Sequence, residues 1–292
     1  MLFIRLLLTV IFLLCPWLVQ AQTQAKPLQV VASFSVLADI AQTIGKEHVL
    51  VHSLLKAEDD PHGWQPTAGD LQLFSTAQIF IINGLNFEPW VAKLTQAAHY
   101  QGTILTASDG IALLYDKRQL PDPHVWHSLN NGIIYARNIT EAFKKLDPAH
   151  ADDYEKNAQI YIKGLQEQHQ HIIQAVLSLP ESNRHFITSH DALGYFAKDY
   201  GLTITPISGL DNNPDISPQK LAGMINLIKQ QHIKAAFFEH NNSSSLIQQL
   251  QAETGIIMGA PLYVDGLARQ GPAANYQGMV STNAQTILTA LQ

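Results

Sequence analysis

The sequence predicts an α/β protein of two doubly wound parallel-sheet lobes joined by one long α-helix. Short apolar segments rich in β-formers alternate with helical segments along most of the 292 residues, which is the pattern of an α/β fold. Segments such as Ile79–Ile82 and Ala235–Phe238 are apolar throughout, as in parallel strands that are covered on both faces. Four such segments occur in each half, with a long helical stretch between the halves.

The two halves have the same alternation of strands and helices. In the first half we expect strands at Leu28–Phe34, His48–Leu55, Gln78–Asn83 and Gly102–Ala107, with helices near Val36–Gly45, Ala68–Ala77 and Glu88–Ala98. In the second half we expect strands at Arg184–Ser189, Leu202–Ile207, Lys234–Glu239 and Ile256–Leu262, with helices near Ala192–Tyr200, Pro218–Gln231, Ser244–Thr254 and Tyr276–Leu291.

A single helix of about 30 residues, from Pro148 to Leu179, is expected between the halves. Asp147-Pro148 is a favourable helix start, because it places an N-cap residue before a proline at the first helical position. Two shorter helices with an unrecognised turn are the alternative. The predicted organisation is therefore a first lobe over residues 26–147, a linking helix over 148–180 and a second lobe over 181–292.

The first 21 residues have the pattern of a cleavable secretory signal peptide. Arg5 precedes an apolar stretch from Leu6 to Val19, and Ala21 is a suitable cleavage position. The stretch is shorter than the ~20 apolar residues that a spanning helix needs, which argues against the alternative of a membrane anchor. We therefore expect a periplasmic protein. Cys15 is the one cysteine of the chain, so cleavage would leave no thiol for metal binding or nucleophilic catalysis.

Composition excludes several classes of protein. The net charge of −6 argues against a nucleic-acid binder, which should present a basic surface. The 46% of hydrophobic residues argues against disorder. The long apolar run at the start is the only one in the sequence, which excludes a polytopic membrane protein.

Four polar residues follow predicted strands and are the candidate site. His62 lies in Asp-Asp-Pro-His-Gly-Trp and His124 in Pro-Asp-Pro-His-Val-Trp. His190 follows the fifth strand in Thr-Ser-His-Asp, and Asp265 follows the eighth in Leu-Tyr-Val-Asp-Gly-Leu. Ligands of open α/β sheets bind beyond the carboxyl ends of the strands, so two lobes that face each other would bring these side chains to one cleft.

Three imidazoles and one carboxylate are a donor set that suits Zn²⁺. Mn²⁺ prefers more oxygen ligands. A ligating histidine usually donates its second ring N–H to a carboxylate or carbonyl group, and Asp60, Asp122, Asp191 and Glu239 are candidates for that role. His127 and His240 are weaker ligand candidates near the same strand ends, and the other histidines are interpreted as surface or helix positions.

The chain also resembles a known family. The resemblance runs from about Val30 to Leu291 and rests on DPHGWQPTAGD (60–70), NGLNFEPW (83–90), DPHVWHS (122–128), TSHDALGYFAKDYGL (188–202), AAFFEHN (235–241) and APLYVDGL (260–267). These segments are similar to those of the metal-binding, zinc- and manganese-uptake class of substrate-binding proteins of ABC transporters, and most like its periplasmic zinc-binding members.

The resemblance implies a function and a partner. It implies that His62, His124, His190 and Asp265 bind the transported metal between two lobes joined by a long helix. It further implies a monomer, with no enzymatic activity, that passes Zn²⁺, or alternatively Mn²⁺, to a membrane permease with a cytoplasmic ATPase.

The chain departs from this family at two places. It lacks the long loop rich in histidine and acidic residues that zinc members often carry between the first two ligands. His127 stands where the family usually has an aliphatic residue, as a candidate for an extra hydrogen bond or a weak extra site. Manganese members often have glutamate at the position of His190, so a histidine there favours zinc.

Two other functions are weaker hypotheses. A secreted zinc hydrolase would use Asp265 as a base, but the sequence has neither a His-Glu-x-x-His helix nor a Gly-x-Ser-x-Gly turn. An adhesin or structural surface protein is not indicated, because there are no repeats and no low-complexity stalk.

Overall fold

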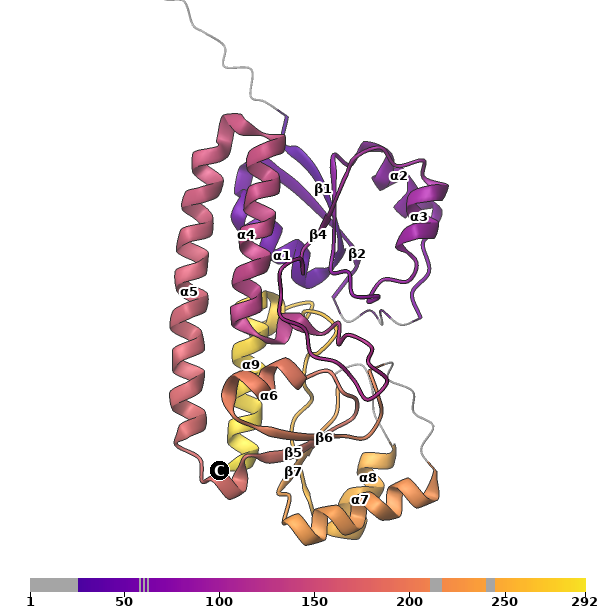
Figure 1. The fold of residues 1–292 in the computed structure, drawn as a ribbon, viewed down its shortest axis with the longest axis vertical. Coiled ribbons are helices and arrows are strands. Elements are labelled where there is room, and N and C mark those ends of the chain that lie inside the picture. The colour runs from indigo at the N-terminus through magenta and orange to yellow at the C-terminus, as the bar shows by residue number, and fades with distance from the viewer. Residues whose placement is uncertain (1–25, 58, 60, 62, 211–216, 240–244) are drawn as a thin grey trace, which may run out of the picture.

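Two α/β lobes lie one above the other, and α5 (Ala151–Leu177) runs along both (Figure 1). The computed structural model describes residues 26–57, 59, 61, 63–210, 217–239 and 245–292, so the predicted signal peptide at 1–21 lies outside the described residues. The predicted fold class of two parallel-sheet lobes joined by one long helix is confirmed.

The first lobe contains a four-stranded parallel sheet in the order β2-β1-β3-β4. Its strands and helices are β1 (Leu28–Phe34), α1 (Ser35–Gly45), β2 (Val49–Leu55), α2 (Ala68–Thr76), β3 (Ile79–Ile82), α3 (Val91–Ala97) and β4 (Thr103–Thr106). Helix α2 begins at a capping box, in which Thr67 and Asp70 bond each other's backbone N–H groups. Local signals of this kind explain why most of these elements were predictable.

The second lobe repeats the topology with the order β6-β5-β7-β8. Its elements are β5 (His185–Thr188), α6 (Gly194–Tyr200), β6 (Thr203–Pro206), α7 (Pro218–Gln231), β7 (Ala235–Phe237), α8 (Ser245–Thr254) and β8 (Ile257–Met258). In each sheet the second strand of the chain lies on one side of the first strand, and the third strand lies on its other side. This reversal creates a switch point between β1 and β3 in the first sheet and between β5 and β7 in the second. Such switch points are where open α/β sheets bind ligands.

The helix α4 (Leu129–Leu146) was not predicted. Its N-cap residue Ser128 accepts a hydrogen bond from the Asn131 backbone N–H, with 3.2 Å between the heavy atoms. Its buried side chains recur at helical spacing, at Ile133, Ala136, Ile139 and Phe143. The signal was therefore present in the sequence. The helix packs against α1 and α5, so it completes the helical layer beside the first sheet.

The long helix is slightly shorter than expected. Residues Pro148–His150 form a 3₁₀ turn, and the α-helix follows from Ala151 to Leu177. Asp152 and Asp153 lie in its first turn, where negative charge interacts favourably with the helix dipole. Among the described helices, none combines the length and apolarity that crossing a membrane requires.

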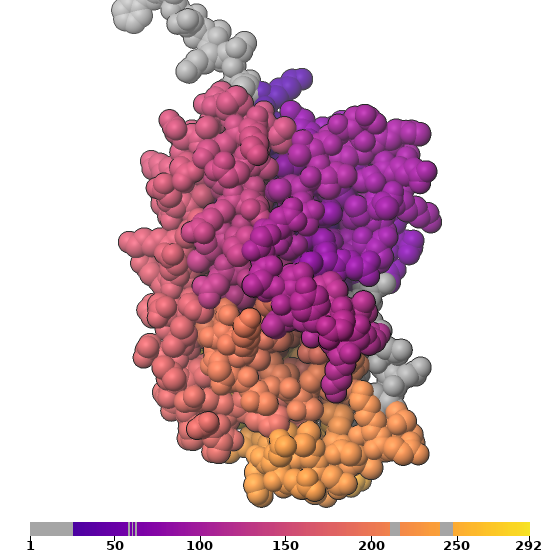
Figure 2. Space-filling view, in the orientation of Figure 1, coloured from indigo at the N-terminus to yellow at the C-terminus, as the bar shows by residue number. Residues whose placement is uncertain are grey.

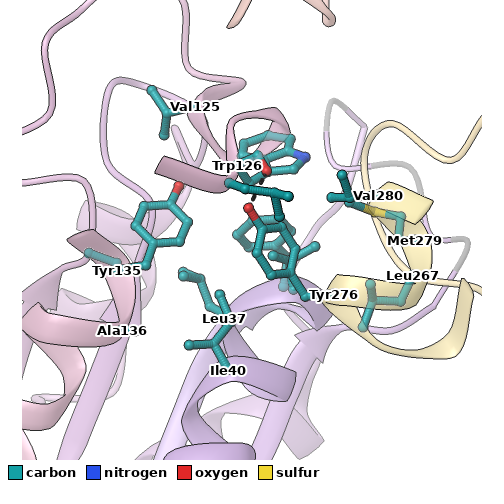
Figure 3. Close-up of a cluster of buried hydrophobic side chains, with 14 of the residues drawn as sticks. Leu37, Ile40, Val125, Trp126, Tyr135, Ala136, Leu267, Tyr276, Met279 and Val280 are labelled. Carbon is teal, nitrogen blue, oxygen red and sulfur yellow. Dashed lines mark hydrogen bonds between the residues drawn. The ribbon is translucent and has the colours of Figure 1, made fainter. Parts of the chain in front are cut away.

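The lobes share a buried core at their junction. Figure 3 shows Leu37 and Ile40 of α1 beside Tyr276 and Met279 of α9 (Tyr276–Leu291), with Trp126 above them. The Tyr276 hydroxyl donates a hydrogen bond to the backbone carbonyl of Trp126 over 2.7 Å. In the space-filling view the magenta end of the first lobe extends over the orange second lobe (Figure 2). The lobes are thus packed together as well as linked by α5.

Candidate metal-binding site

His124 is held in one orientation by the residues around it. It lies in the segment between β4 and α4, and its side chain is fully buried. One oxygen of Asp122, Oδ1, lies 2.8 Å from His124 Nδ1 and also accepts the His124 backbone N–H over 2.9 Å. Trp126 packs edge-on against the imidazole ring. If Nδ1 donates to the carboxylate, Nε2 carries the lone pair through which the ring would bind a metal ion.

His190 is fixed in the same way from the second lobe. It lies two residues after the end of β5, and its Nδ1 hydrogen-bonds Glu239, which lies two residues after the end of β7. Ser189 donates a hydrogen bond to the same Glu239 oxygen over 2.5 Å. His190 and Glu239 therefore lie at the switch point of the second sheet, where the topology leads one to expect a ligand.

Asp265 completes a cluster of three buried donors. The Oδ1 atom of Asp265 lies 3.9 Å from Nε2 of His124 and 3.9 Å from Nε2 of His190. The two Nε2 atoms are 3.4 Å apart. One ligand atom of each residue lies within 4.8 Å of the others, and the three side chains are buried. A single cation placed between them could bind all three.

Burial and hydrogen bonding shift the pKa values of the ionisable groups around the site. Burial opposes protonation of His190, but its hydrogen bond to Glu239 and the negative charge of Asp265 raise its pKa to about 9. Burial acts to raise the pKa of Glu239, but the hydrogen bond and charge of His190, together with the bond from Ser189, hold that pKa below its usual value. Burial raises the pKa of Asp122 to about 7, although its hydrogen bond from the His124 backbone works against this.

The second lobe also holds the segment that carries His124. The Tyr195 hydroxyl on α6 donates to the carbonyl of Asp122 over 3.0 Å and accepts the backbone N–H of Leu114 over 2.9 Å. Ser128, at the start of α4, donates to Asp199 of α6 over 2.5 Å. The relative position of His124 and His190 is therefore set by bonds between the lobes.

The structure places most of the candidate residues. It brings together three of the four, His124, His190 and Asp265. His62 and the weaker candidate His240 lie outside the described residues, as does Asp60. Two of the expected carboxylate partners, Asp122 and Glu239, bond the ligand candidates.

His127 proves to be a hydrogen-bonding residue. Its side chain is buried, and its Nε2 lies 2.9 Å from the carbonyl of Val264, the residue before Asp265. Trp126 bonds the same carbonyl, and sequence analysis did not assign it any role. A tryptophan two residues after a ligand candidate was the available signal, but its partner lies 138 residues further along the chain.

Comparisons with known proteins agree with the fold. A family model described as the periplasmic component A of zinc-uptake complexes matches residues 30–290.

Three relatives illustrate the range of metals. The iron-binding protein YfeA of Yersinia pestis is 31% identical over 269 residues, which cover 90% of this chain and 86% of that protein. The manganese ABC transporter substrate-binding lipoprotein PsaA of Streptococcus pneumoniae is 29% identical over 282 residues, covering 93% and 91% of the two chains. The periplasmic zinc-binding protein TroA of Treponema pallidum has a solved structure with a TM-score of 0.85 and 25% identity, covering 91% of this chain and 99% of that one.

Proposed function

Because the chain belongs to the family of periplasmic components of zinc-uptake complexes, we propose that it captures Zn²⁺ between its lobes and delivers it to an ABC permease. The chain is the metal-binding, substrate-binding component of an ABC transporter and is not an enzyme. We propose in addition which metal it carries, which residues bind that metal and how it is delivered.

One observation carries the proposal. His124, His190 and Asp265 come from distant parts of the chain, and their ligand atoms lie within 4.8 Å of one another in a buried place. Desolvating two imidazoles and a carboxylate is costly unless something compensates for it, and a bound cation does so. We assign these three residues as ligands, with His62 as the fourth.

The donor set supports zinc as the cargo. Three imidazoles and one carboxylate match the tetrahedral nitrogen and oxygen coordination of Zn²⁺. Manganese is the competing cargo, because a relative is named as a manganese-transporter lipoprotein and another as iron-binding. Manganese sites are richer in oxygen ligands than this one.

Delivery requires the site to open. We propose that the protein is exported to the periplasm after cleavage of residues 1–21 and acts there as a monomer. Its working division is a first lobe over 26–147, a linking helix over 148–180 and a second lobe over 181–292. Docking to the permease, which is energised by its cytoplasmic ATPase, would separate His190 from His124 and so release the metal.

Calorimetric titration tests the ligand assignment. Metal-stripped protein should bind one Zn²⁺ per chain. Zn²⁺ affinity should fall by about 100-fold or more in each of four variants, since the loss of even an outer partner of a metal ligand lowers metal affinity by about 10–100-fold. The variants are His124→Ala, His190→Ala, Asp265→Ala and His62→Ala. The matched control is His171→Ala, an exposed histidine of α5, which should bind like the wild type. Wild-type affinity in His124→Ala or His190→Ala would refute the assignment.

The choice between zinc and manganese needs a second experiment. Zn²⁺ outcompetes Mn²⁺ at most sites of this kind, so affinity in vitro does not identify the cargo. Elemental analysis of the protein isolated from its own compartment should find zinc in the majority of chains. A majority of manganese or iron would overturn the zinc assignment and leave the transport function intact.

A further inference from the structure

The peptide group that precedes Asp265 is bonded by two aromatic rings from the first lobe. The backbone carbonyl of Val264 accepts the indole N–H of Trp126 over 2.8 Å and lies 2.9 Å from Nε2 of His127. All three residues are buried. A carbonyl oxygen has two lone pairs, so this group is fully satisfied by the two rings.

Both donors belong to the segment that carries His124. Trp126 and His127 lie in the 3₁₀ turn Val125–His127, which begins one residue after His124. The backbone N–H of His127 bonds the carbonyl of His124 over 3.3 Å, which ties the turn to the ligand candidate itself. The ligand candidate His124 is therefore followed at once by the turn whose two side chains bond the peptide group before Asp265.

The surrounding core leaves this turn little freedom. Tyr276 of α9 donates its hydroxyl hydrogen bond to the Trp126 carbonyl, and Figure 3 shows the two side chains packed among buried residues of α1 and α9. On the far side of Asp265, the backbone N–H of Leu267 bonds Ser35 Oγ at the start of α1 over 3.0 Å. Both flanks of Asp265 are thus bonded to the first lobe.

His127 can play this part because its ring nitrogen can donate a hydrogen bond. A carbonyl group only accepts hydrogen bonds, so Nε2 of His127 must carry the proton. A leucine would fill similar space without donating, and would leave the Val264 carbonyl with one partner fewer.

We propose that Trp126 and His127 are positioning residues that hold the Asp265 carboxylate at its distance from His124. The proposal rests on the proposed function, since it assigns a role within the same metal site. Neither ring needs to touch the metal. By bonding the peptide before Asp265, they couple the segments that carry two of the ligands, so that His124 and Asp265 form one preorganised unit.

The expected consequence is kinetic. A metal ion that reaches His124 and His190 should still enter at the wild-type rate. If Asp265 is less well held, the bound ion should leave faster, because its carboxylate ligand is lost more often. Loss of the positioning bonds should therefore raise the dissociation rate constant and leave the association rate constant nearly unchanged.

The test compares His127→Leu, which keeps the bulk and removes the donor, with His127→Gln, whose amide restores an N–H in a similar place. Zn²⁺ dissociation into excess chelator should be faster in His127→Leu by about 10-fold, the lower end of the effect of outer partners on metal sites. In His127→Gln it should be within about 3-fold of the wild type on the same scale. Trp126→Phe, which removes the other donor, should behave like His127→Leu.

The absorption spectrum of bound Co²⁺ provides a second measurement, which a loss of stability alone would not change. The visible absorption of the Co²⁺-loaded protein reports ligand number and geometry, and it should change in His127→Leu and Trp126→Phe and not in His127→Gln. The control is His185→Leu, which removes a half-buried histidine bonded to Thr205 at the other end of β5. It should lower thermal stability without changing the spectrum or the dissociation rate.

The outcomes separate the two proposals. If the wild type fails to bind Zn²⁺ or Co²⁺, the proposed function is wrong. If the wild type binds both ions but His127→Leu and Trp126→Phe keep its dissociation rate and its Co²⁺ spectrum, the positioning role is wrong and the function stands.

Discussion

The Nε2 atoms of His124 and His190 face each other across 3.4 Å, although the two residues belong to different lobes. The opposite nitrogen of each ring is bonded to a carboxylate, Asp122 in the first lobe and Glu239 in the second. The two rings are thus oriented before any ion arrives. This preorganisation is the basis of the first prediction.

Replacing Glu239 with glutamine should lower Zn²⁺ affinity by about 10–100-fold, because His190 loses the carboxylate that orients its ring and increases its basicity. Competition titration with a chromophoric chelator measures the change. Glu253→Gln is the matched control, since Glu253 is exposed on α8. An affinity for Glu239→Gln equal to that of the control would show that the carboxylate does not support the ligand.

Removing the metal should lower the melting temperature. A ligand that binds only the folded state at 100 times its Kd stabilises that state by about 2.7 kcal/mol, or roughly 5–10 °C for a protein of this size. Calorimetric scans with increasing Zn²⁺ should show a rising midpoint. The rise should be absent in His190→Ala, and its persistence there would place the stabilising ion at another site.

The buried carboxyl group of Glu88 should make stability depend on pH. It accepts hydrogen bonds from Ser33 Oγ at 2.6 Å and from the backbone N–H groups of Asn83 and Gly84 at 2.6 and 3.0 Å. Burial nevertheless raises its pKa from 4.5 to about 7. The folded state therefore binds this proton more tightly than the unfolded state does, and the stability it confers is lost as pH rises from 4.5 to 7.

The variant Glu88→Gln lacks this titration. As the pH rises from about 4.5 to about 7.5, the unfolding free energy of the variant should increase relative to that of the wild type by up to about 3 kcal/mol, the value that corresponds to this shift in pKa. Urea unfolding of metal-free protein across that range provides the measurement. A difference between the two proteins that does not vary with pH would rule out the titration of Glu88.

Two helical glycines should respond oppositely to alanine. A Cβ at Gly132 in α4 would lie 2.6 Å from the hydroxyl of Tyr276, which is fully buried and bonded to the Trp126 carbonyl. A Cβ at Gly223 in α7 would meet nothing within 4 Å. We expect Gly132→Ala to destabilise the protein by about 1–3 kcal/mol and Gly223→Ala to stabilise it by about 0.5–1 kcal/mol.

Chemical denaturation of both variants checks this pair, with each serving as the control for the other. Equal stabilisation by both substitutions would contradict the close packing of Tyr276 on Gly132, because it would mean that the junction between α4 and α9 can accommodate a methyl group.

Much of the fold followed from local patterns. The limits of β1, α7 and α9 match the prediction. Strand composition, an N-cap serine or asparagine and a proline each influence only the few residues next to them, so these limits can be predicted from the local sequence. The helix α4 was missed although its periodicity is clear afterwards. Its buried face includes Gly132 and Thr140 among the apolar residues, so its apolar pattern is diluted.

The candidate ligands were likewise accessible from the sequence, since each follows a strand whose carboxyl end could be inferred. The sequence indicated Glu239 as one of several possible partners of a histidine ring. Its position in the chain did not show that this ring is that of His190. The pairing of Trp126 and His127 with Val264 joins residues more than 130 positions apart. Residue types and strand ends thus reveal which groups are available for metal binding. Which groups meet is decided by the packing of one lobe on the other. Hydrogen bonds act over about 3 Å and metal–ligand bonds over about 2 Å, so both depend on contacts between distant segments that local propensities do not determine.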